Sequence, residues 1–505
     1  MIVGAGPVGL TLAAALAKHG IPCLLLEKKA KLDDHSRALA VAARTLEILH
    51  SLGLADACMT AGNFLREIGL YNVNRQKVAL RMSFEEVASE TAYPGMLFLS
   101  QGRLESILLH GVLASGLCDV RFDHQFVSYQ EISEGVSVTF LDSRGVKTTT
   151  IVSFLVGCDG AHSAVRQCWG QASEGITFPV RVFLFDVRLS DSFLDDLPFP
   201  RFYLTRSRLV GAVRYEAFHW RILFARPVDE KNQEGLSRDN LPDLVARLFG
   251  PGQFEQFWAG VFSIHSRIAA SFRKGRVLLA GDAAHISSPA GGQGMNSGMQ
   301  DAHNLGWKLA LALKGGDVER LLDSYHQERH SAVATGVLPF TTRLSRFPLR
   351  PRFFRVGLSL MALALSSRRV RRAAGRGLGM LGTRYKKSCL ILGRRKWAGR
   401  SAPGAALGKS TVFTFGISGK ILKELERTTS ELNREYLPFG LTVCSIEKSD
   451  PLWKRWRARS NLVALVRPDG YTGWAALAPS AAEMCTGIRG ALGIAGPDSR
   501  CNDGS

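Results

Sequence analysis

The first 27 residues, Met1–Glu27, read MIVGAGPVGLTLAAALAKHGIPCLLLE and decide the fold class. Met1–Val3 is typical of the end of a buried strand that runs into a glycine-rich turn. Leu10–His19 predicts a helix closed by Gly20, and Ile21–Glu27 predicts a second buried strand. A strand, a glycine turn, a helix and a strand in this order predict a Rossmann-like α/β unit.

Three glycines in this turn suit the binding of a dinucleotide. Gly4 allows the tight turn, Gly6 lets the backbone approach a pyrophosphate, and Gly9 permits close contact between helix and strand. Glu27 ends the second strand, 23 residues after Gly4, where its carboxylate can accept hydrogen bonds from a ribose diol. The pattern predicts a nucleotide site without separating NAD from FAD.

A second motif, CDGAHSAVR at Cys158–Arg166, follows the predicted strand Ile151–Val156. Asp159 lies beside a glycine, where a carboxylate can approach the phosphate or ribose side of a cofactor. The alternative is an ordinary turn in which Ser163 caps the next helix. Both interpretations stay open from these residues alone.

A third motif, GDAAH at Gly281–His285, follows a predicted buried strand and continues through Pro289 to a glycine-rich helix start. An acid at the strand end, Asp282, can bind ribitol hydroxyls. The glycines before Asn296 expose N–H groups at the start of the predicted helix Asn296–Leu313, which suits the anionic edge of a flavin ring. The histidine of this motif is interpreted as a structural hydrogen-bonding residue rather than a base.

The rest of the chain predicts a second sheet and a last module. Expected helices are Arg37–Gly53, Arg103–Ala114 and Lys420–Tyr436. Expected strands are Val136–Leu141, Thr177–Leu189, Phe202–Val213, His219–Phe224 and a hairpin of Leu462–Arg467 and Thr472–Leu477.

The net charge of +20 is concentrated in one segment. Residues 343–400 contain 17 Lys and Arg and no Asp or Glu, which leaves +3 for the rest of the chain. A solvated helical face and a contact with an anionic membrane surface both remain open as explanations. Nucleic acid is not an expected partner, because no binding motif accompanies the charge.

Cysteine usage and apolar runs limit the possible classes of protein. None of the nine cysteines is spaced C-x-x-C, so the sequence predicts no metal site and no dithiol redox motif. The chain start lacks the basic residues of a signal peptide, and the longest apolar run, Val356–Leu365, is too short to span a bilayer. We therefore expect a cytoplasmic protein, with peripheral membrane contact through residues 343–400 left open.

In this order and spacing, the three motifs resemble those of the single-component FAD-dependent aromatic hydroxylases, the family of p-hydroxybenzoate hydroxylase and phenol hydroxylase. Supporting stretches are Arg37-Ala38, Arg44–Glu47, Ser100-Gln101 and His265-x-Arg267. Two later stretches, Leu381–Ser388 and Val466–Tyr471, are similar to those of family members with a C-terminal thioredoxin-like module.

The resemblance implies an α/β protein with a Rossmann-like FAD-binding domain of the glutathione reductase type. Its two parts would be residues 1–174 and 265–330, with a substrate-binding β-sheet domain inserted at 175–264. A basic helical segment with a linker would occupy 331–403, and a thioredoxin-like module 404–505. Because that module has no C-x-x-C, it is not expected to be a redox unit.

The implied activity is hydroxylation of a phenolic or polyketide-like small molecule by an FAD-dependent monooxygenase. NAD(P)H would be the co-substrate, and oxygen would reach the aromatic ring from a flavin hydroperoxide. Two alternatives remain: a flavoprotein reductase or dehydrogenase without oxygen insertion, and a non-catalytic scaffold that no longer holds FAD.

The resemblance also implies roles for individual residues. Asp159 would serve both FAD and the incoming nicotinamide nucleotide, and Pro289 would lie near the reacting flavin carbon. The residue that activates the substrate would come from Tyr203, Arg214, Tyr215 and His219, among which Tyr215 and His219 are preferred. The residues implied to hold FAD are Gly4, Gly6, Gly9, Glu27, Arg37, Arg44, Gln101, Asp159, Gly281, Asp282, Gly294, Met295 and Asn296.

Overall fold

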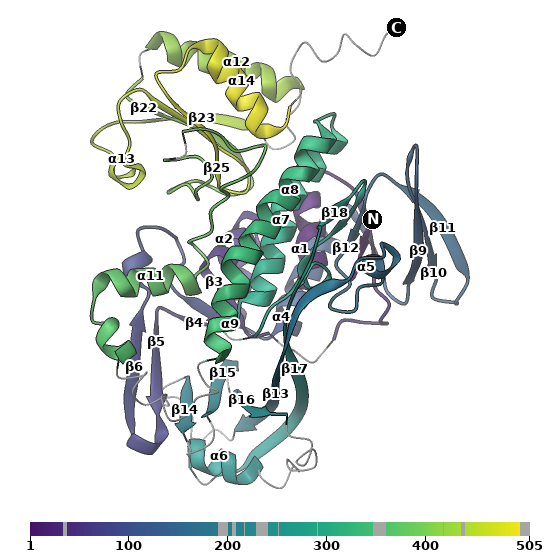
Figure 1. Cartoon of the computed structure of the whole chain (residues 1–505), viewed down its shortest axis with the longest axis vertical. Coiled ribbons are helices and arrows are strands. Elements are labelled where there is room, and N and C mark those ends of the chain that lie inside the picture. Colours follow the sequence, from purple (N-terminus) through teal and green to yellow (C-terminus); the bar gives the residue numbers. More distant parts are fainter. Residues whose placement is uncertain are drawn as a thin grey trace.

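The computed structural model describes residues 1–33, 38–189, 200–204, 209–216, 218–228, 241–250, 252–289, 291–346, 360–394, 396–417, 419–435 and 440–494. Figure 1 shows a C-terminal module at one end and helices α1 (Pro7–Lys18) and α7 (Gln293–Leu313) in the middle. The long strands β13 (Ser173–Leu189) and β17 (Phe254–Ala269) reach toward the other end.

The central sheet has six strands in the order β18-β19-β12-β1-β2-β8, and only β18 and β19 are antiparallel. α1 follows β1 and packs against α7 and α4 (Gln101–Ala114), which confirms the predicted Rossmann-like unit. β12 and β19 are fully buried, as expected for parallel strands covered on both faces. The strands are β1 (Ile2–Val3), β2 (Cys23–Leu26), β8 (Cys118–Arg121), β12 (Leu155–Gly157), β18 (Arg273–Lys274) and β19 (Val277–Leu279).

The predicted helix Arg37–Gly53 is wrong in its first part. Ala40–Ala42 forms strand β3, which pairs with β7 (Met96–Phe98), and helix α2 spans Ala43–Ser51. The side-chain amide of Asn296 accepts a hydrogen bond from the last N–H of β3 and donates one to its first carbonyl, both at 2.8 Å. These bonds hold the backbone extended, and their source lies 254 positions along the chain, where no local pattern reports it.

A second sheet has eight strands in the order β20-β17-β13-β16-β15-β14-β5-β6. It takes β5 and β6 from before residue 175, so it draws on both sides of the predicted boundary of the inserted domain. The predicted strand Phe202–Val213 is two strands, and β17 and helix α6 (Leu241–Phe249) have no predicted counterpart. The remaining strands are β5 (Glu67–Asn72), β6 (Lys77–Ser83), β14 (Arg201–Leu204), β15 (Leu209–Glu216), β16 (His219–Pro227) and β20 (His285–Ile286).

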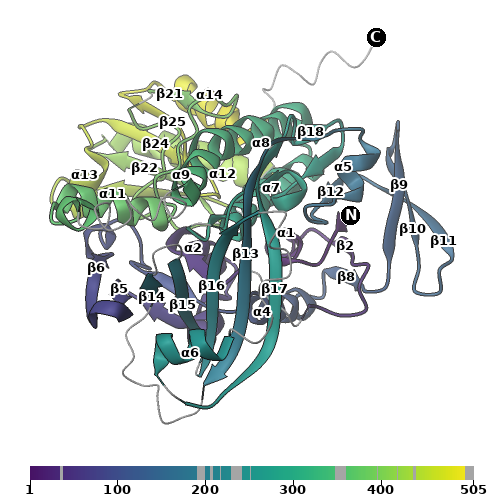
Figure 2. The same ribbon diagram turned by 60° about the horizontal axis from the view of Figure 1, so that its bottom comes forward.

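The two faces of this second sheet have different neighbours. Helix α6 covers one face, where Val187, Ile222 and Phe224 are buried. On the opposite face Tyr215 packs with Phe98 of β7, at the boundary with the nucleotide-type unit. Figure 2 shows β13, β16 and β17 side by side, with α6 toward their far end. A ligand between the two units would therefore meet the Tyr215 face.

Further helices and a small three-stranded sheet complete the part of the chain before residue 379. The small sheet has the order β11-β10-β9 and the central strand confirms the prediction at Val136–Leu141. The elements are α3 (Ala55–Ala61), β4 (Asn63–Leu65), β9 (Gln125–Ile132), β10 (Gly135–Leu141), β11 (Lys147–Val152), α5 (Ala164–Cys168), α8 (Val318–Ala332), α9 (Leu338–Arg346) and α11 (Arg368–Leu378).

The C-terminal module is built on a five-stranded sheet in the order β21-β25-β24-β22-β23. Its antiparallel hairpin of β24 and β25 confirms the prediction. Throughout the described residues, no helix is both long enough and apolar enough to cross a membrane. The elements of the module are β21 (Leu392–Gly393), β22 (Ser410–Phe415), α12 (Gly419–Glu435), β23 (Leu441–Ile446), α13 (Pro451–Trp456), β24 (Leu462–Val466), β25 (Thr472–Leu477) and α14 (Ala481–Leu492).

Candidate cofactor and substrate site

The first glycine turn is packed as the motif requires. Gly4 has φ +104°, and a Cβ there would lie 2.5 Å from the carbonyl oxygen of Cys158. A Cβ on Gly9 would lie 1.9 Å from the carbonyl oxygen of Gly4. A Cβ on Gly6 would instead meet no atom within 4 Å. The turn therefore leaves open space at the N-terminus of α1, where a phosphate group can approach.

Glu27 lies at the edge of this turn. Its two carboxylate oxygens accept hydrogen bonds from the N–H groups of Ala5 (2.8 Å) and Lys29 (3.1 Å). These bonds hold the carboxylate beside the glycine turn at the carboxyl end of β2. That position is the one at which a ribose diol is expected.

The second motif presents a free acceptor atom. Asp159 Oδ2 accepts hydrogen bonds from Ala164 N–H (2.7 Å) and Val165 N–H (3.2 Å) at the start of α5. Its Oδ1 is buried and has no partner among the described residues. Burial raises the pKa of the Asp159 carboxyl above its ordinary value. A buried orphan acceptor next to the glycine turn fits a ligand that carries hydroxyl or N–H donors.

The third motif lies against the first. Gly281 has φ +62°, and a Cβ there would lie 2.7 Å from Cγ2 of Val8 in α1. The exposed Asp282 follows it at the end of β19. Arg166 joins the second motif to the third by donating to the Ala283 carbonyl at 2.7 Å. The structure thus brings all three motifs to one edge of the central sheet.

The histidine of the third motif is enclosed in a charged cluster. His285 Nε2 lies 2.7 Å from Asp301 Oδ2, and Arg329 Nε donates to Asp301 Oδ1 at 2.7 Å. All three side chains are buried. Burial opposes ionisation of Asp301, but His285 and Arg329 hold its pKa below the ordinary value. These contacts agree with the structural role expected for the histidine.

The start of α7 carries the remaining predicted flavin contacts. Gly292 has φ +64°, and a Cβ there would lie 2.9 Å from that of Ala40. Asn296 donates to the Gly292 carbonyl at 2.6 Å in addition to its two bonds with β3. Its amide is therefore occupied by backbone and positions the turn, while the half-buried Gly294 and Met295 lie beside it. Pro289 is exposed before this turn.

The other residues predicted to line FAD take different positions. Gln101 accepts from the Ala38 N–H (3.3 Å) and donates to Glu105 (2.8 Å), next to β3. Arg44 donates to Glu47 at 2.7 Å and to the Asp469 carbonyl of the C-terminal module at 2.7 Å. The flavin-lining role expected for Arg44 stays a prediction, and the contacts described here tie its guanidinium to the C-terminal module. Arg37 lies outside the described residues.

A buried ion pair lies on the sheet face that meets the nucleotide-type unit. Arg221 Nε and Nη2 donate to the two oxygens of Asp186 at 2.7 and 2.6 Å. The guanidinium lies over the rings of Tyr215 (5.8 Å) and Trp258 (5.2 Å). Burial and the nearby Asp186 raise the pKa of Tyr215 well above its usual range. Tyr215 therefore remains protonated near neutral pH and can act as a hydrogen-bond donor but not as a base.

The other preferred residue, His219, lies beside an acid that sequence reasoning missed. Glu216 Oε2 is 3.5 Å from His219 Nδ1, and Glu216 Oε1 accepts from the Ser100 hydroxyl at 2.8 Å. Ser100 is the residue before Gln101, so this contact joins the second sheet to the nucleotide-type unit. The sequence signal that could have found this contact is the Ser100-Gln101 pair before α4, one of the stretches that carry the family resemblance. Of the other candidates, Tyr203 lies on β14 and Arg214 on β15.

Five buried polar residues that no sequence motif indicated form a second cluster, here named the interface network. Arg467 donates to both oxygens of Glu328 (2.6 and 2.8 Å) and to Asp469 (2.6 Å). Lys308 donates to Glu328 (2.9 Å), and Asn304 donates to Asp469 (2.8 Å). The network ties helices α7 and α8 to the turn between β24 and β25 of the C-terminal module.

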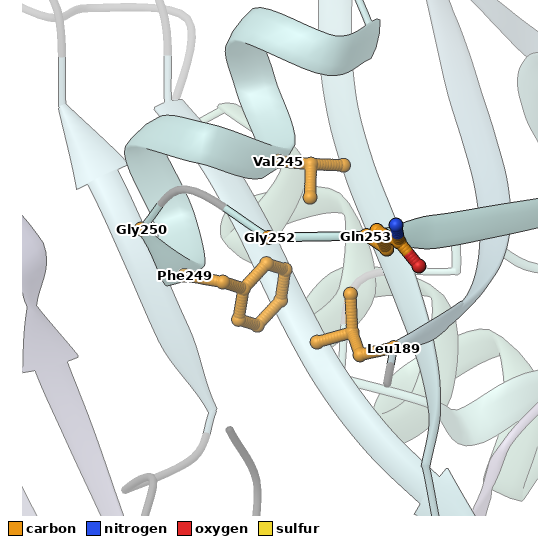
Figure 3. A pocket seen from close by; sticks show the side chains of 6 residues that line it. All are labelled: Leu189, Val245, Phe249, Gly250, Gly252 and Gln253. Atoms are coloured by element: carbon orange, nitrogen blue, oxygen red, sulfur yellow. The ribbon is translucent and has the colours of Figure 1, made fainter. Parts of the chain in front are cut away.

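A small hollow lies apart from these groups. Figure 3 shows it at the C-terminal end of α6, with only Gln253 contributing a polar side chain. None of the predicted site residues lines it, so we assign it no part in the chemistry. Its lining is Leu189, Val245, Phe249, Gly250, Gly252 and Gln253.

Comparison with known proteins agrees with this site. The model of the FAD binding domain family matches residues 1–341. A flavin-dependent monooxygenase of Mycobacteroides abscessus is 35% identical over 362 residues, 68% of this chain and 73% of the relative. An uncharacterized aromatic compound monooxygenase of Bacillus subtilis, YhjG, is 31% identical over 503 residues, 96% of each chain. A 3-(3-hydroxy-phenyl)propionate/3-hydroxycinnamic acid hydroxylase of Comamonas testosteroni is 35% identical, but the match spans only 55% of that relative and 65% of this chain.

Solved structures share the whole architecture. OxyS, an anhydrotetracycline hydroxylase from Streptomyces rimosus, has a TM-score of 0.77 at 28% identity and covers 98% of this chain and 99% of its own. A ternary complex of aklavinone-11 hydroxylase with FAD and aklavinone has the same fold, with a TM-score of 0.82 at 22% identity and coverage of 97% and 98%. The open space at Gly6, the orphan acceptor of Asp159 and these matches lead to one conclusion: the chain belongs to the FAD binding domain family and is a flavin-dependent aromatic monooxygenase.

Proposed function

We propose that the enzyme hydroxylates a phenolic or polyketide-like aromatic compound, with NAD(P)H as the electron donor and O₂ as the oxygen source. The observation that carries this proposal is that Tyr215, His219 and Trp258 share the sheet face toward the FAD motifs. Aromatic rings suit a planar substrate, while a hydroxyl and an imidazole can hydrogen-bond its oxygen atoms. OxyS and the hydroxyphenylpropionate hydroxylase, named for hydroxylated aromatic substrates, support this substrate class.

Separate residues would hold the two ends of FAD. The open turn at Gly6 and the N-terminus of α1 would take the pyrophosphate, Glu27 the adenosine ribose, and Asp282 the ribitol hydroxyls. When bound, FAD supplies hydride transfer and the activation of oxygen. Pro289 would exclude water from the reacting side, since it has no N–H to offer. Tyr215 would donate a hydrogen bond that orients the substrate.

NAD(P)H would reach the same edge of the central sheet. Asp159 offers one free buried oxygen there, and Arg166 lies beside it with contacts to both the second and third motifs. One acceptor and one cation suit the ribose and phosphate groups of a nucleotide. The sequence contains one G-x-G-x-x-G motif in a strand–helix context, so we place both nucleotides at this edge.

The function is tested by purifying the protein and following three quantities together. We expect flavin absorbance, NADPH oxidation stimulated by a phenol, and a product that contains one oxygen atom taken from O₂, with chloride or nitrite released where the ring carbon attacked carries that group. The phenol panel is 3-hydroxyphenylpropionate, 1-hydroxyanthraquinone, p-nitrophenol and pentachlorophenol. NADPH oxidation without an oxygenated product would indicate a reductase or dehydrogenase, and a protein that binds no FAD would indicate a scaffold.

We further propose that residues 404–505 are a thioredoxin-like module in a structural role. The described part supports this: β22, α12 and β23 form a parallel β-α-β unit, β24 and β25 add an antiparallel hairpin, and α14 follows. Its turn between β24 and β25 supplies Arg467 and Asp469 to the interface network. Native mass and FAD content of a chain truncated after residue 403 would test whether the remainder holds the cofactor alone.

A peripheral contact with an anionic membrane is a second proposal, carried by one exposed patch. Leu360 and Leu363 are 61% and 71% exposed. Arg368 and Arg369 lie on the adjoining turn of α11 and are exposed as well. Apolar side chains beside arginines suit the boundary between acyl chains and anionic headgroups. Flotation with phosphatidylserine vesicles should fall for Leu360→Ser/Leu363→Ser but not for the exposed control Leu313→Ser; equal binding would contradict the proposal.

A further inference from the structure

A polar chain of three side chains crosses from the FAD-binding part to the second sheet. The Ser100 hydroxyl donates to Glu216 Oε1 at 2.8 Å, and Glu216 Oε2 lies 3.5 Å from His219 Nδ1. Glu216 ends β15 and His219 begins β16, so the hairpin turn brings the two together. Both side chains are 32% exposed. A ligand and solvent can therefore reach the pair, while Ser100 fixes its position from the other unit.

Aromatic packing holds the plane of the His219 ring. Tyr215 is stacked on it with 6.0 Å between ring centroids, and Phe257 of β17 meets it edge-on at 5.3 Å. Nδ1 faces Glu216, and Nε2 makes no hydrogen bond within the described part of the chain. The ring is thus held by its neighbours with one nitrogen open to a ligand.

Few charges act on this ring. Glu216 faces it from β15, and Arg188 of β13 lies opposite it in the strand ladder and is exposed. Arg221, two residues further along β16, is neutralised by the two-point ion pair with Asp186. Glu216 is therefore the anion that lies at Nδ1 of His219.

We propose that His219 is the catalytic residue that accepts the proton of the substrate's aromatic hydroxyl, with Glu216 and Ser100 as positioning residues. This inference rests on the proposed hydroxylation of a phenolic substrate. The substrate O–H bond breaks, a new N–H bond forms at Nε2, and the electron pair stays on oxygen. The phenolate ring is richer in electrons and reacts faster with an electrophilic oxygen. The proton then leaves His219 through its exposed edge to water.

Phenols that differ in ionisation separate this role from a structural one. The variants His219→Gln, Glu216→Gln and Ser100→Ala are assayed as FAD-loaded enzymes at pH 8 on the four phenols named above. For 3-hydroxyphenylpropionate and the hydroxyanthraquinone, which keep their phenolic proton, we expect kcat to fall about 100-fold or more in His219→Gln. Glu216→Gln and Ser100→Ala should lower it about tenfold, as loss of an orienting partner does elsewhere. For pentachlorophenol, which is fully ionised at this pH, and p-nitrophenol, which is largely ionised, kcat should stay nearly unchanged.

Contact between His219 and the phenol is measured without turnover. Trypsin releases Tyr215–Arg221, in which His219 is the single histidine, so mass spectrometry can follow its modification by diethyl pyrocarbonate. p-Nitrophenol at nine times its dissociation constant should slow this modification about tenfold by occupancy. An unprotected His219 would overturn the inference.

A matched control and two contrary outcomes complete the test. Glu67→Gln removes an exposed carboxylate that pairs with Arg81 on the same sheet, and it should leave all four rates unchanged. Equal losses on protonated and ionised phenols would assign the three residues a structural role and overturn the inference while the proposed function stands. A wild-type holoenzyme that hydroxylates none of the four phenols would overturn the proposed function, and this inference with it.

Discussion

Replacing Glu328 with glutamine should loosen the C-terminal module from the FAD-binding part. Glu328 is fully buried and accepts hydrogen bonds from Arg467, Lys308, Asn304 and the Ser388 hydroxyl. When residue 328 carries no charge, the buried cations Arg467 and Lys308 are left with Asp469 as the remaining acid of the interface network. Removing one partner of a buried pair typically costs about 3–5 kcal/mol, because the other charge stays desolvated.

This loss of free energy sets how much more often the contact between the C-terminal module and the FAD-binding part should open. At about 1.4 kcal/mol per tenfold, 3–5 kcal/mol corresponds to an increase of roughly 10²- to 10³-fold or more in the opening constant of the interface. Hydrogen exchange with mass spectrometry measures it in peptides from α8 and from the β24–β25 hairpin. Glu319→Gln is the matched control, since it lies on the same helix with its side chain 76% exposed. Exchange of Glu328→Gln equal to that of the control would refute the reasoning.

Three further outcomes follow from the site and the interface network. Asp282→Ala should weaken FAD binding by roughly 1.5–3 kcal/mol, the value of a hydrogen bond to a charged group, and a titration of apoprotein with FAD that shows unchanged affinity would contradict the third motif's role. Pro289→Ser should keep FAD but divert NADPH oxidation toward hydrogen peroxide, so peroxide and product are counted per NADPH, and wild-type coupling would exclude Pro289 from the wall of the site. Acid should loosen the interface, because Arg467 and Lys308 hold the pKa of Glu328 below its ordinary value despite burial. The stabilisation that Glu328 contributes is full above its pKa in the unfolded chain and is lost as the pH falls toward its pKa in the folded protein. Glu328→Gln should lack this pH dependence when hydrogen exchange is measured between these two pKa values.

The elements that sequence reasoning predicted well are those whose signal is local. The turn at Gly4, the hairpin of β24 and β25, and the helix that became α7 each carry their own glycine, alternation or helical spacing. Strand β17 was missed although it is 16 residues long, because an irregularity in its pairing with β13 at Phe257 interrupts its alternation. Apolar residues on both faces, over Phe257–Phe262, remove the period-2 alternation that would mark a half-exposed strand.

Other contacts could not be predicted for a different reason, namely that the partners lie far along the chain. Arg44 has the sequence context of a flavin-lining residue, but its guanidinium bonds to the Asp469 carbonyl, 425 positions away. Asn296 likewise uses its amide on β3 rather than offering it to a ligand. Glu216 was missed because its role depends on its contact with Ser100, 116 positions earlier. A single sequence shows which residue types are present, but not which distant groups they will form hydrogen bonds with.

Helix α7 connects the cofactor motif to the C-terminal module. Its first turn, held by Asn296, carries the predicted flavin contacts, while Asn304 and Lys308 further along take part in the interface network. The helix is buried from Asn296 to Ala312, so neither end can shift without moving packed side chains. Through Glu328 and Asp469, Arg467 is therefore connected to the same helix whose first turn carries the predicted flavin contacts, which gives a module without a redox motif a packed connection to that turn.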